Sequence, residues 1–172
     1  MARVSTRENK NIYQLTRENL KLTRETASEL LESIPPERIE KIENERSFPH
    51  PDEVLTMAEK YKKPDLCNYY CANQCPIGQE YVPEVKIMDL SQIVLEMLAS
   101  LNAMNKRKDR LIEITADGKI SDDELEDFLY IHEELERISI TVETLQLWAE
   151  KMLAAGVIDE ARYDAYRSRK KT

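Results

Sequence analysis

The sequence predicts an all-α fold, and three observations support that prediction. Of the 172 residues only 3 are glycine, while 34% are charged and 41% are hydrophobic, a composition that favours helices over sheets. Hydrophobic residues recur at spacings of three and four, as on one face of a helix. Prolines and capping residues fall between these runs. The chain therefore divides into short amino-terminal helices and long carboxyl-terminal ones.

Two short helices are predicted at the amino-terminal end. The first starts near Thr6 or Asn9. The second covers residues 24–31, because the Thr23 hydroxyl oxygen can accept a hydrogen bond from an N–H group of the first turn. One tight turn joins the two helices. Their side chains expected to face a common core are Ile12, Leu15, Leu20, Ala27, Leu30 and Leu31.

Three more short helices are expected before residue 75. Pro36 begins a third helix that ends near Asn44, since a proline at the first helical position loses no hydrogen bond. Asp52 is expected to cap a fourth helix, and Pro64 opens a fifth. The core-facing side chains expected here are Ile39, Ile42, Val54, Leu55 and Ala58.

The carboxyl-terminal half is predicted to be a long helical hairpin. Pro76, Gly78 and Pro83 indicate a linker at residues 76–84. Amphipathic helices over 85–114 and 122–154 follow, joined at Asp117-Gly118, with Ser121 and Glu124 as a capping box. The side chains expected to face inward are Ile87, Leu90, Val94, Met97, Leu98, Leu101 and Met104 on the first helix, and Leu125, Phe128, Leu129, His132, Leu135, Ile138, Val142, Leu145, Trp148 and Met152 on the second.

These elements give a domain at residues 1–75, a linker at 76–84 and a hairpin module at 85–172. The module is expected to end in a short helix after Asp159 and a basic tail, Arg167 to Thr172. Two antiparallel helices can cover only one face of each other. We therefore expect the module to act in dimerisation or effector response, with a second copy of the chain as its simplest partner.

The formal charge of −8 is distributed unevenly along the chain. Residues 1–63 carry 12 basic and 12 acidic side chains, so the excess of negative charge lies in residues 64–172. A neutral first domain remains compatible with a nucleic-acid partner, which an evenly acidic chain would not be. No apolar run approaches the length of a membrane span, and residues 1–10 are too charged for a signal peptide. We expect a cytoplasmic protein.

No enzymatic site is expected. The sequence has no glycine-rich phosphate loop, no pairing of a nucleophile with a base, and no pair of carboxylates associated with a pocket.

Several segments between residues 7 and 72 together carry a family resemblance. They include Arg17-Glu18-Asn19, Leu22-Thr23-Arg24-Glu25, Ala27-Ser28-Glu29-Leu30-Leu31 and Pro51-Asp52-Glu53-Val54-Leu55. In this order the segments resemble the Cro/C1-type (XRE) helix-turn-helix transcriptional regulators of bacteria and phages. The resemblance implies a five-helix, lambda-repressor-like domain that binds double-stranded DNA. Its second helix would cross the DNA backbone and its third would enter the major groove.

The resemblance also implies roles for individual residues. Thr23 and Arg24 match phosphate-contacting positions, and Arg17 with Glu43 matches an internal bridge. The positions that would read bases are Pro35, Pro36, Glu37, Arg38, Glu40 and Lys41.

A second hypothesis arises from the carboxylates of the third helix. Glu37 and Glu40 can accept a hydrogen bond from cytosine N4, but they repel phosphate. Glu32 also occupies a turn position where glycine is common. The alternative is therefore a helix-turn-helix scaffold of phage or mobile-element origin, reused as an adaptor that binds a protein.

Three cysteines, Cys67, Cys71 and Cys75, are spaced C-x3-C-x3-C. Residues four apart share a helix face, so these thiols can converge. Three thiolates with a fourth ligand such as His50 can bind zinc, or they can hold an iron-sulfur cluster with an external ligand. The spacing is not that of a standard zinc pair. Small cysteines buried at the end of the fifth helix without any cofactor, or exposed thiols that pair into one disulfide, remain open as well.

Overall fold

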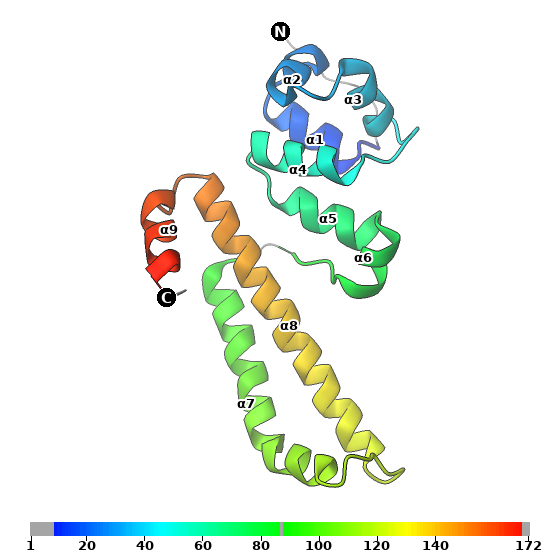
Figure 1. Cartoon of the computed structure of the whole chain (residues 1–172), viewed down its shortest axis with the longest axis vertical. Coiled ribbons are helices and arrows are strands. Elements are labelled where there is room, and N and C mark those ends of the chain that lie inside the picture. The colour runs from blue at the N-terminus through cyan, green and yellow to red at the C-terminus, as the bar shows by residue number, and fades with distance from the viewer. Residues whose placement is uncertain (1–8, 87, 170–172) are drawn as a thin grey trace. The chain divides into compact units, whose positions relative to one another are not determined.

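The computed structural model describes residues 9–86 and 88–169, and over these residues the chain is helical without any strand (Figure 1). The all-α prediction is therefore confirmed for the described part. The helices are α1 (Ile12–Asn19), α2 (Arg24–Leu31), α3 (Pro36–Glu43), α4 (Pro51–Lys60), α5 (Asp65–Asn73), α6 (Pro76–Tyr81), α7 (Leu90–Thr115), α8 (Leu125–Ala154) and α9 (Glu160–Arg169). None of them is long and apolar enough to cross a membrane.

The chain separates into two compact units. One comprises Val85–Trp148, and the other comprises Met1–Glu84 with Ala149–Thr172. The first of these begins at the expected end of the linker. Residues 76–81, which were expected within that linker, instead form α6. Pro76 occupies the start of this helix, where its missing N–H costs nothing, so the proline begins a helix rather than preventing one.

The core of the amino-terminal helices is formed by α1 to α5. Its buried side chains include Leu31, Ile34, Ile39, Ile42, Val54, Met57 and Leu66, each at most 2% exposed. Four side chains expected in this core, Leu15, Leu20, Leu30 and Leu55, are instead 39–62% exposed. A helix of eight to ten residues presents only two or three positions to one side, and better-placed neighbours such as Ala27 and Leu31 fill them.

The helix starts follow local capping chemistry. Asn11 accepts from the backbone N–H of Gln14 at 3.0 Å at the start of α1, and Thr23 accepts from Thr26 at 3.1 Å at the start of α2. The expected start at Thr6 lies outside the described residues. Asp52 does not cap α4, because Pro51 already occupies the first helical position and the cap moves back to His50.

Helices α7 and α8 form an antiparallel hairpin (Figure 1). At the loop end, Arg107 and Arg110 near the end of α7 contact Asp127 near the start of α8 at 3.0 and 2.7 Å. The backbone N–H and the hydroxyl of Ser121 both donate to the Glu124 carboxylate, which is half of the predicted capping box. The other half is missing, because the Glu124 N–H donates to the Ser121 carbonyl oxygen at 3.1 Å and not to the hydroxyl. Asp159 likewise caps the short last helix, α9, through the N–H of Arg162.

The buried stripe of the hairpin differs from the predicted one. Ile93, Ser100 and Ile114 are buried on α7, and Ile131, Glu134, Thr141, Thr144 and Leu147 are buried on α8. Most of the side chains that were expected to face inward are exposed. They are His132 and eight aliphatic side chains that are each at least 39% exposed, namely Leu90, Val94, Leu98, Leu101, Leu125, Leu129, Leu135 and Val142. Ile87 lies outside the described residues. Apolar residues cover two adjacent stripes on each helix, and only one stripe can face the neighbouring helix.

Candidate nucleic-acid interface

Helices α2 and α3 are joined by the four residues Glu32 to Pro35. Glu32 has φ 59° and ψ −45°, and the Ser33 N–H donates to the Leu31 carbonyl oxygen at 2.5 Å, which together define a γ-turn of positive φ. Ile34 is 1% exposed and anchors the turn in the core. The turn therefore fixes where α3 starts.

A buried ion pair fixes the other end of α3. Arg17 on α1 donates from Nε to Glu43 Oε1 at 2.5 Å and from Nη2 to Oε2 at 3.0 Å. Arg24 at the start of α2 donates to the same carboxylate at 2.9 Å, and Arg17 Nη1 also reaches the Leu22 carbonyl at 2.6 Å. The Glu43 side chain is 1% exposed. This arrangement ties α1, α2 and α3 together, as expected for Arg17 and Glu43.

Arg38, expected to read bases, instead binds residues of the loop before α4 and of the first turn of α4. Its guanidinium makes a two-point contact with Glu53 at 2.7 Å, and it donates to Ser47 Oγ at 2.6 Å and to the Phe48 carbonyl at 2.9 Å. Burial opposes ionisation of Glu53, but the hydrogen bonds from Arg38 and from the His50 N–H lower the pKa of this carboxyl. Arg38 thus acts as a clamp that joins α3 to Ser47 and Phe48 of the loop and to Glu53 in the first turn of α4.

The remaining predicted residues of α3 lie on the side of the helix opposite to its buried anchors. Ile39 and Ile42 point into the core, whereas Glu37 and Lys41 are exposed and Glu40 is partly exposed. Pro35 is exposed and Pro36 partly exposed at the start of the helix. With Arg38 engaged elsewhere, the outer face of α3 carries two carboxylates and one ammonium group.

The start of α2 is the second predicted contact point. Its N–H groups carry partial positive charge, because the first turn of a helix has no intrahelical acceptors for them. The Glu25 carboxyl lies in this first turn, and its own backbone N–H and then the Thr23 hydroxyl lower its pKa. The start of α2 therefore already carries an anionic side chain of its own. Arg24 lies beside it with its side chain 31% exposed.

Three further residues belong to this surface that the sequence analysis did not identify. Lys21 and Arg46 are exposed cations in the segments that follow α1 and α3, and Phe48 is 69% exposed. Lys21 and Glu45, the residue before Arg46, have φ of 58°. Lys21 and Arg46 could have been found from the sequence, since each is a basic residue within two positions of a predicted helix end.

The three cysteines lie on consecutive elements. Cys67 and Cys71 belong to α5 and Cys75 precedes α6; all three are free thiols and partly buried. Burial raises the pKa of the Cys67 thiol, with Cys71 adding to the effect. Among the described residues, no group of three or more His, Cys, Asp or Glu side chains is arranged to hold a metal ion. The metal hypothesis therefore gains no geometric support from these thiols.

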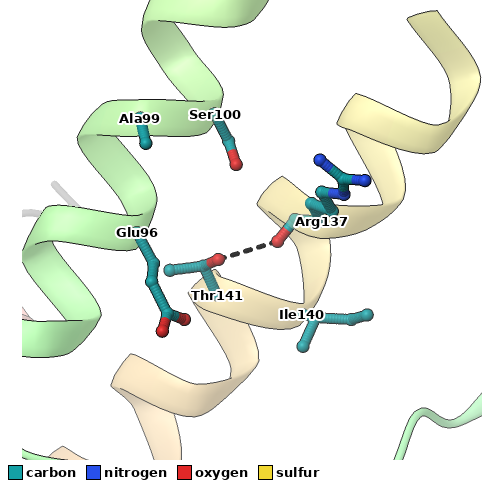
Figure 2. A pocket seen from close by; sticks show the side chains of 6 residues that line it. All are labelled: Glu96, Ala99, Ser100, Arg137, Ile140 and Thr141. Carbon is teal, nitrogen blue, oxygen red and sulfur yellow. Dashed lines mark hydrogen bonds between the residues drawn. The ribbon is translucent and has the colours of Figure 1, made fainter. Parts of the chain in front are cut away.

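A groove of about 310 Å³ also opens between α7 and α8. It is lined by Glu96, Ala99, Ser100, Arg137, Ile140 and Thr141, as Figure 2 shows. Two small side chains at buried positions, Ser100 and Thr141, leave this space, and the Thr141 hydroxyl donates to the Arg137 carbonyl at 2.7 Å. The groove is therefore explained by small side chains at the helix contact.

Of the predicted contact residues, Thr23 and Arg24 lie at the start of α2, and Glu37, Glu40 and Lys41 lie on α3 with at least part of each side chain open to solvent. Comparison of the chain with protein-family models, with curated proteins and with solved structures gives no match.

Proposed function

We propose that this chain is a DNA-binding transcriptional regulator of the Cro/C1 (XRE) type, which acts as a dimer on double-stranded DNA. One observation carries the proposal. Helix α3 is held by buried anchors at Ile39, Ile42 and Glu43, while its opposite face and the start of α2 are open to solvent. That is the division of roles in a helix-turn-helix, where one helix enters the major groove and the other meets the backbone.

The charges assign the contacts within this proposal. Lys21, Arg24, Lys41 and Arg46 are the cations that would meet phosphates, together with the N–H groups at the start of α2. Glu37 and Glu40 would accept from cytosine N4, which favours a cytosine-containing site. Because one neutral domain with few cations binds weakly, two copies on one operator are needed for useful affinity.

The proposal is tested with a fluorescence-anisotropy titration of DNA from the region upstream of the chain's own gene. Lys41→Ala should weaken binding and reduce the slope of log affinity against log salt by about 1, as loss of one phosphate contact does. Lys62→Ala, an equally cationic and exposed position outside the proposed contacts, is the control and should change neither quantity. Equal effects of the two variants would argue against a contact at Lys41.

A protein-binding adaptor is the second candidate, because Arg38 is occupied by Glu53 and α3 presents Glu37 and Glu40 outward. A basic protein surface would form ion pairs with these two carboxylates, whereas the phosphates of DNA repel them. Under this alternative, replacing both with Gln weakens the complex with the protein partner and leaves DNA binding unchanged. Under the primary proposal, the same double variant changes the preferred DNA sequence.

A further inference from the structure

The hairpin has an exposed apolar face that its own two helices do not cover. On α7 the face consists of Val94, Leu98 and Leu101, and on α8 of Leu135 and Val142; these five side chains, called the apolar face below, are 39–51% exposed. Exposed apolar side chains that gather on one side of a helix pair are typical of an interaction site.

The residues of the apolar face lie on one side of the hairpin. Val94 and Leu101 each follow a buried residue of α7 by one position, and Leu135 and Val142 do the same on α8. One residue is a rotation of about 100° around a helix, and in antiparallel helices the same rotation leads to the same side of the pair. The residues that precede the buried Ser100 and Thr141, namely Ala99 and Ile140, line the groove on the other side (Figure 2).

The size of this side suits a dimer. The 26 residues of α7 span about 39 Å, and two adjacent helices are about 20 Å wide. The side therefore offers about 800 Å² to a partner, which is the area that each partner of a standard stable interface contributes. A second hairpin placed on it would complete a four-helix bundle.

The charges favour one orientation of the second copy. Residues 106–110 of α7 read Lys-Arg-Lys-Asp-Arg, while residues 122–136 of α8 contain eight carboxylates. The contacts of Arg107 and Arg110 with Asp127 place these two segments at the same level of the hairpin. With both loops at one end, α7 of each copy lies across from α8 of the other, so each basic segment faces an acidic one.

The opposite orientation lacks this complementarity. With the two loops at opposite ends, α8 lies across from α8, and the acidic segment faces the stretch that contains Glu143 and Glu150. We infer that two copies of this chain associate through the apolar face with their 116–124 loops at the same end of a four-helix bundle. This inference deepens the dimer of the proposed function and does not depend on DNA binding.

One consequence concerns the amino-terminal units. In this orientation Val85 of both copies lies at the end of the bundle away from the loops, so both units are tethered at that end. Two tethered helix-turn-helix units at one end are suited to the two half-sites of a palindrome.

The orientation is tested by the distance between nitroxide labels at Lys119→Cys, measured by pulsed electron paramagnetic resonance. The full-length chain carries Ser at positions 67, 71 and 75, and its mass in solution is compared with that of the unaltered chain as a control. Loops at the same end predict a distance below about 30 Å, the width of the bundle plus the label arms. A distance of about 40 Å or more, the length of the hairpin, would overturn the orientation.

The face itself is tested by Leu98→Asp with Leu135→Asp, at two side chains that are 51% and 47% exposed in the single chain. We expect at least a 100-fold weaker dimer by sedimentation, with unchanged helix content. Ile140→Asp is the matched control: Ile140 is 40% exposed on α8 but lines the groove on the other side of the hairpin. An unaltered chain that is monomeric, or a dimer weakened equally by Ile140→Asp, would contradict the inference. DNA binding by the unaltered chain and by the double variant is measured separately. A chain that dimerises without binding DNA would contradict the proposed function alone, and a chain that binds DNA without dimerising would contradict this inference alone.

Discussion

Arg17 and Glu43 form a two-point ion pair in which both side chains are at most 8% exposed, with contacts of 2.5 and 3.0 Å. The pair joins the last turn of α1 to the last turn of α3. Its carboxylate is further bound by Arg24. The orientation of α3, and with it the proposed DNA contact, therefore depends on a charge that is buried among hydrophobic side chains.

Removing one member of this pair should be far worse than removing both. Glu43→Leu leaves the Arg17 guanidinium buried without its carboxylate, and we expect a loss of about 3–5 kcal/mol in the free energy of unfolding. The double variant Arg17→Met with Glu43→Leu replaces both charges with apolar groups and should recover most of that loss. Urea denaturation measures both values. A double variant as unstable as Glu43→Leu would contradict this account.

The Arg38–Glu53 clamp should make stability depend on pH in the acid range. The hydrogen bonds from Arg38 and His50 lower the pKa of Glu53 in the folded chain, so this contribution is present above the unfolded pKa of about 4.3. It is lost as the pH falls through the lower, folded pKa. Glu53→Gln should therefore flatten the stability curve below about pH 4.3.

The measurement is thermal unfolding of the unaltered chain and of Glu53→Gln between neutral and acid pH. Glu59→Gln, at an exposed position on the same helix, is the control. Arg38→Ala should reproduce the effect of Glu53→Gln on the curve, because both break the same contact. Curves of the same shape for Glu53→Gln and the unaltered chain would refute the assignment.

The turn between α2 and α3 should tolerate glycine better than its own residue. Glu32 has φ 59°, where a side chain is strained by about 1 kcal/mol or more. Glu32→Gly should therefore stabilise the chain by about 1 kcal/mol, measured as a rise in Tm. Glu32→Ala is the control, since it also removes the 3.2 Å contact with Lys60 but keeps the Cβ atom. If Glu32→Ala raised Tm as much as Glu32→Gly, relief of backbone strain at position 32 would be excluded as the cause.

The Glu25 carboxylate should compete with DNA phosphate for the start of α2. Its pKa is lowered by its own backbone N–H and by the Thr23 hydroxyl, two donors that a phosphate oxygen at this helix start would also use. Glu25→Gln should raise DNA affinity by about 2- to 5-fold at low salt, in line with the usual strength of charge at a helix start. Glu29→Gln makes the same charge change one turn later and should have a smaller effect. Equal gains would indicate only a general effect of net charge.

The short helices were predictable because their signals are local. The cap at Thr23, the prolines at 36, 51 and 64, and the helical spacing of apolar residues all act within a few positions. Asp52 was wrongly predicted as the cap of α4 because two local signals are adjacent there. Pro51 is in fact the first helical residue, so the cap is His50 and Asp52 already lies within the helix. The Arg17–Glu43 pair was expected only from the family resemblance.

The rest of the site depends on contacts between distant residues. Arg38 was expected to read bases, but Ser47, Phe48 and Glu53, up to 15 residues further on, take its donors. In the hairpin, the sequence identifies apolar residues but not which of two adjacent stripes meets the other helix. Polar residues such as Ser100 and Glu134 occupy buried positions there, and their apolar neighbours are left outside.

The central claim is that α3 and the start of α2 bind DNA, and the most direct test is the affinity of the unaltered chain for its own upstream DNA measured against salt concentration. Four cations on each copy predict a slope of log affinity against log salt of up to about −7 for a dimer. Affinity should then fall by about 10³-fold or more between about 50 and 200 mM salt. An absence of binding at the lowest salt, or an affinity that salt does not change, would contradict the claim.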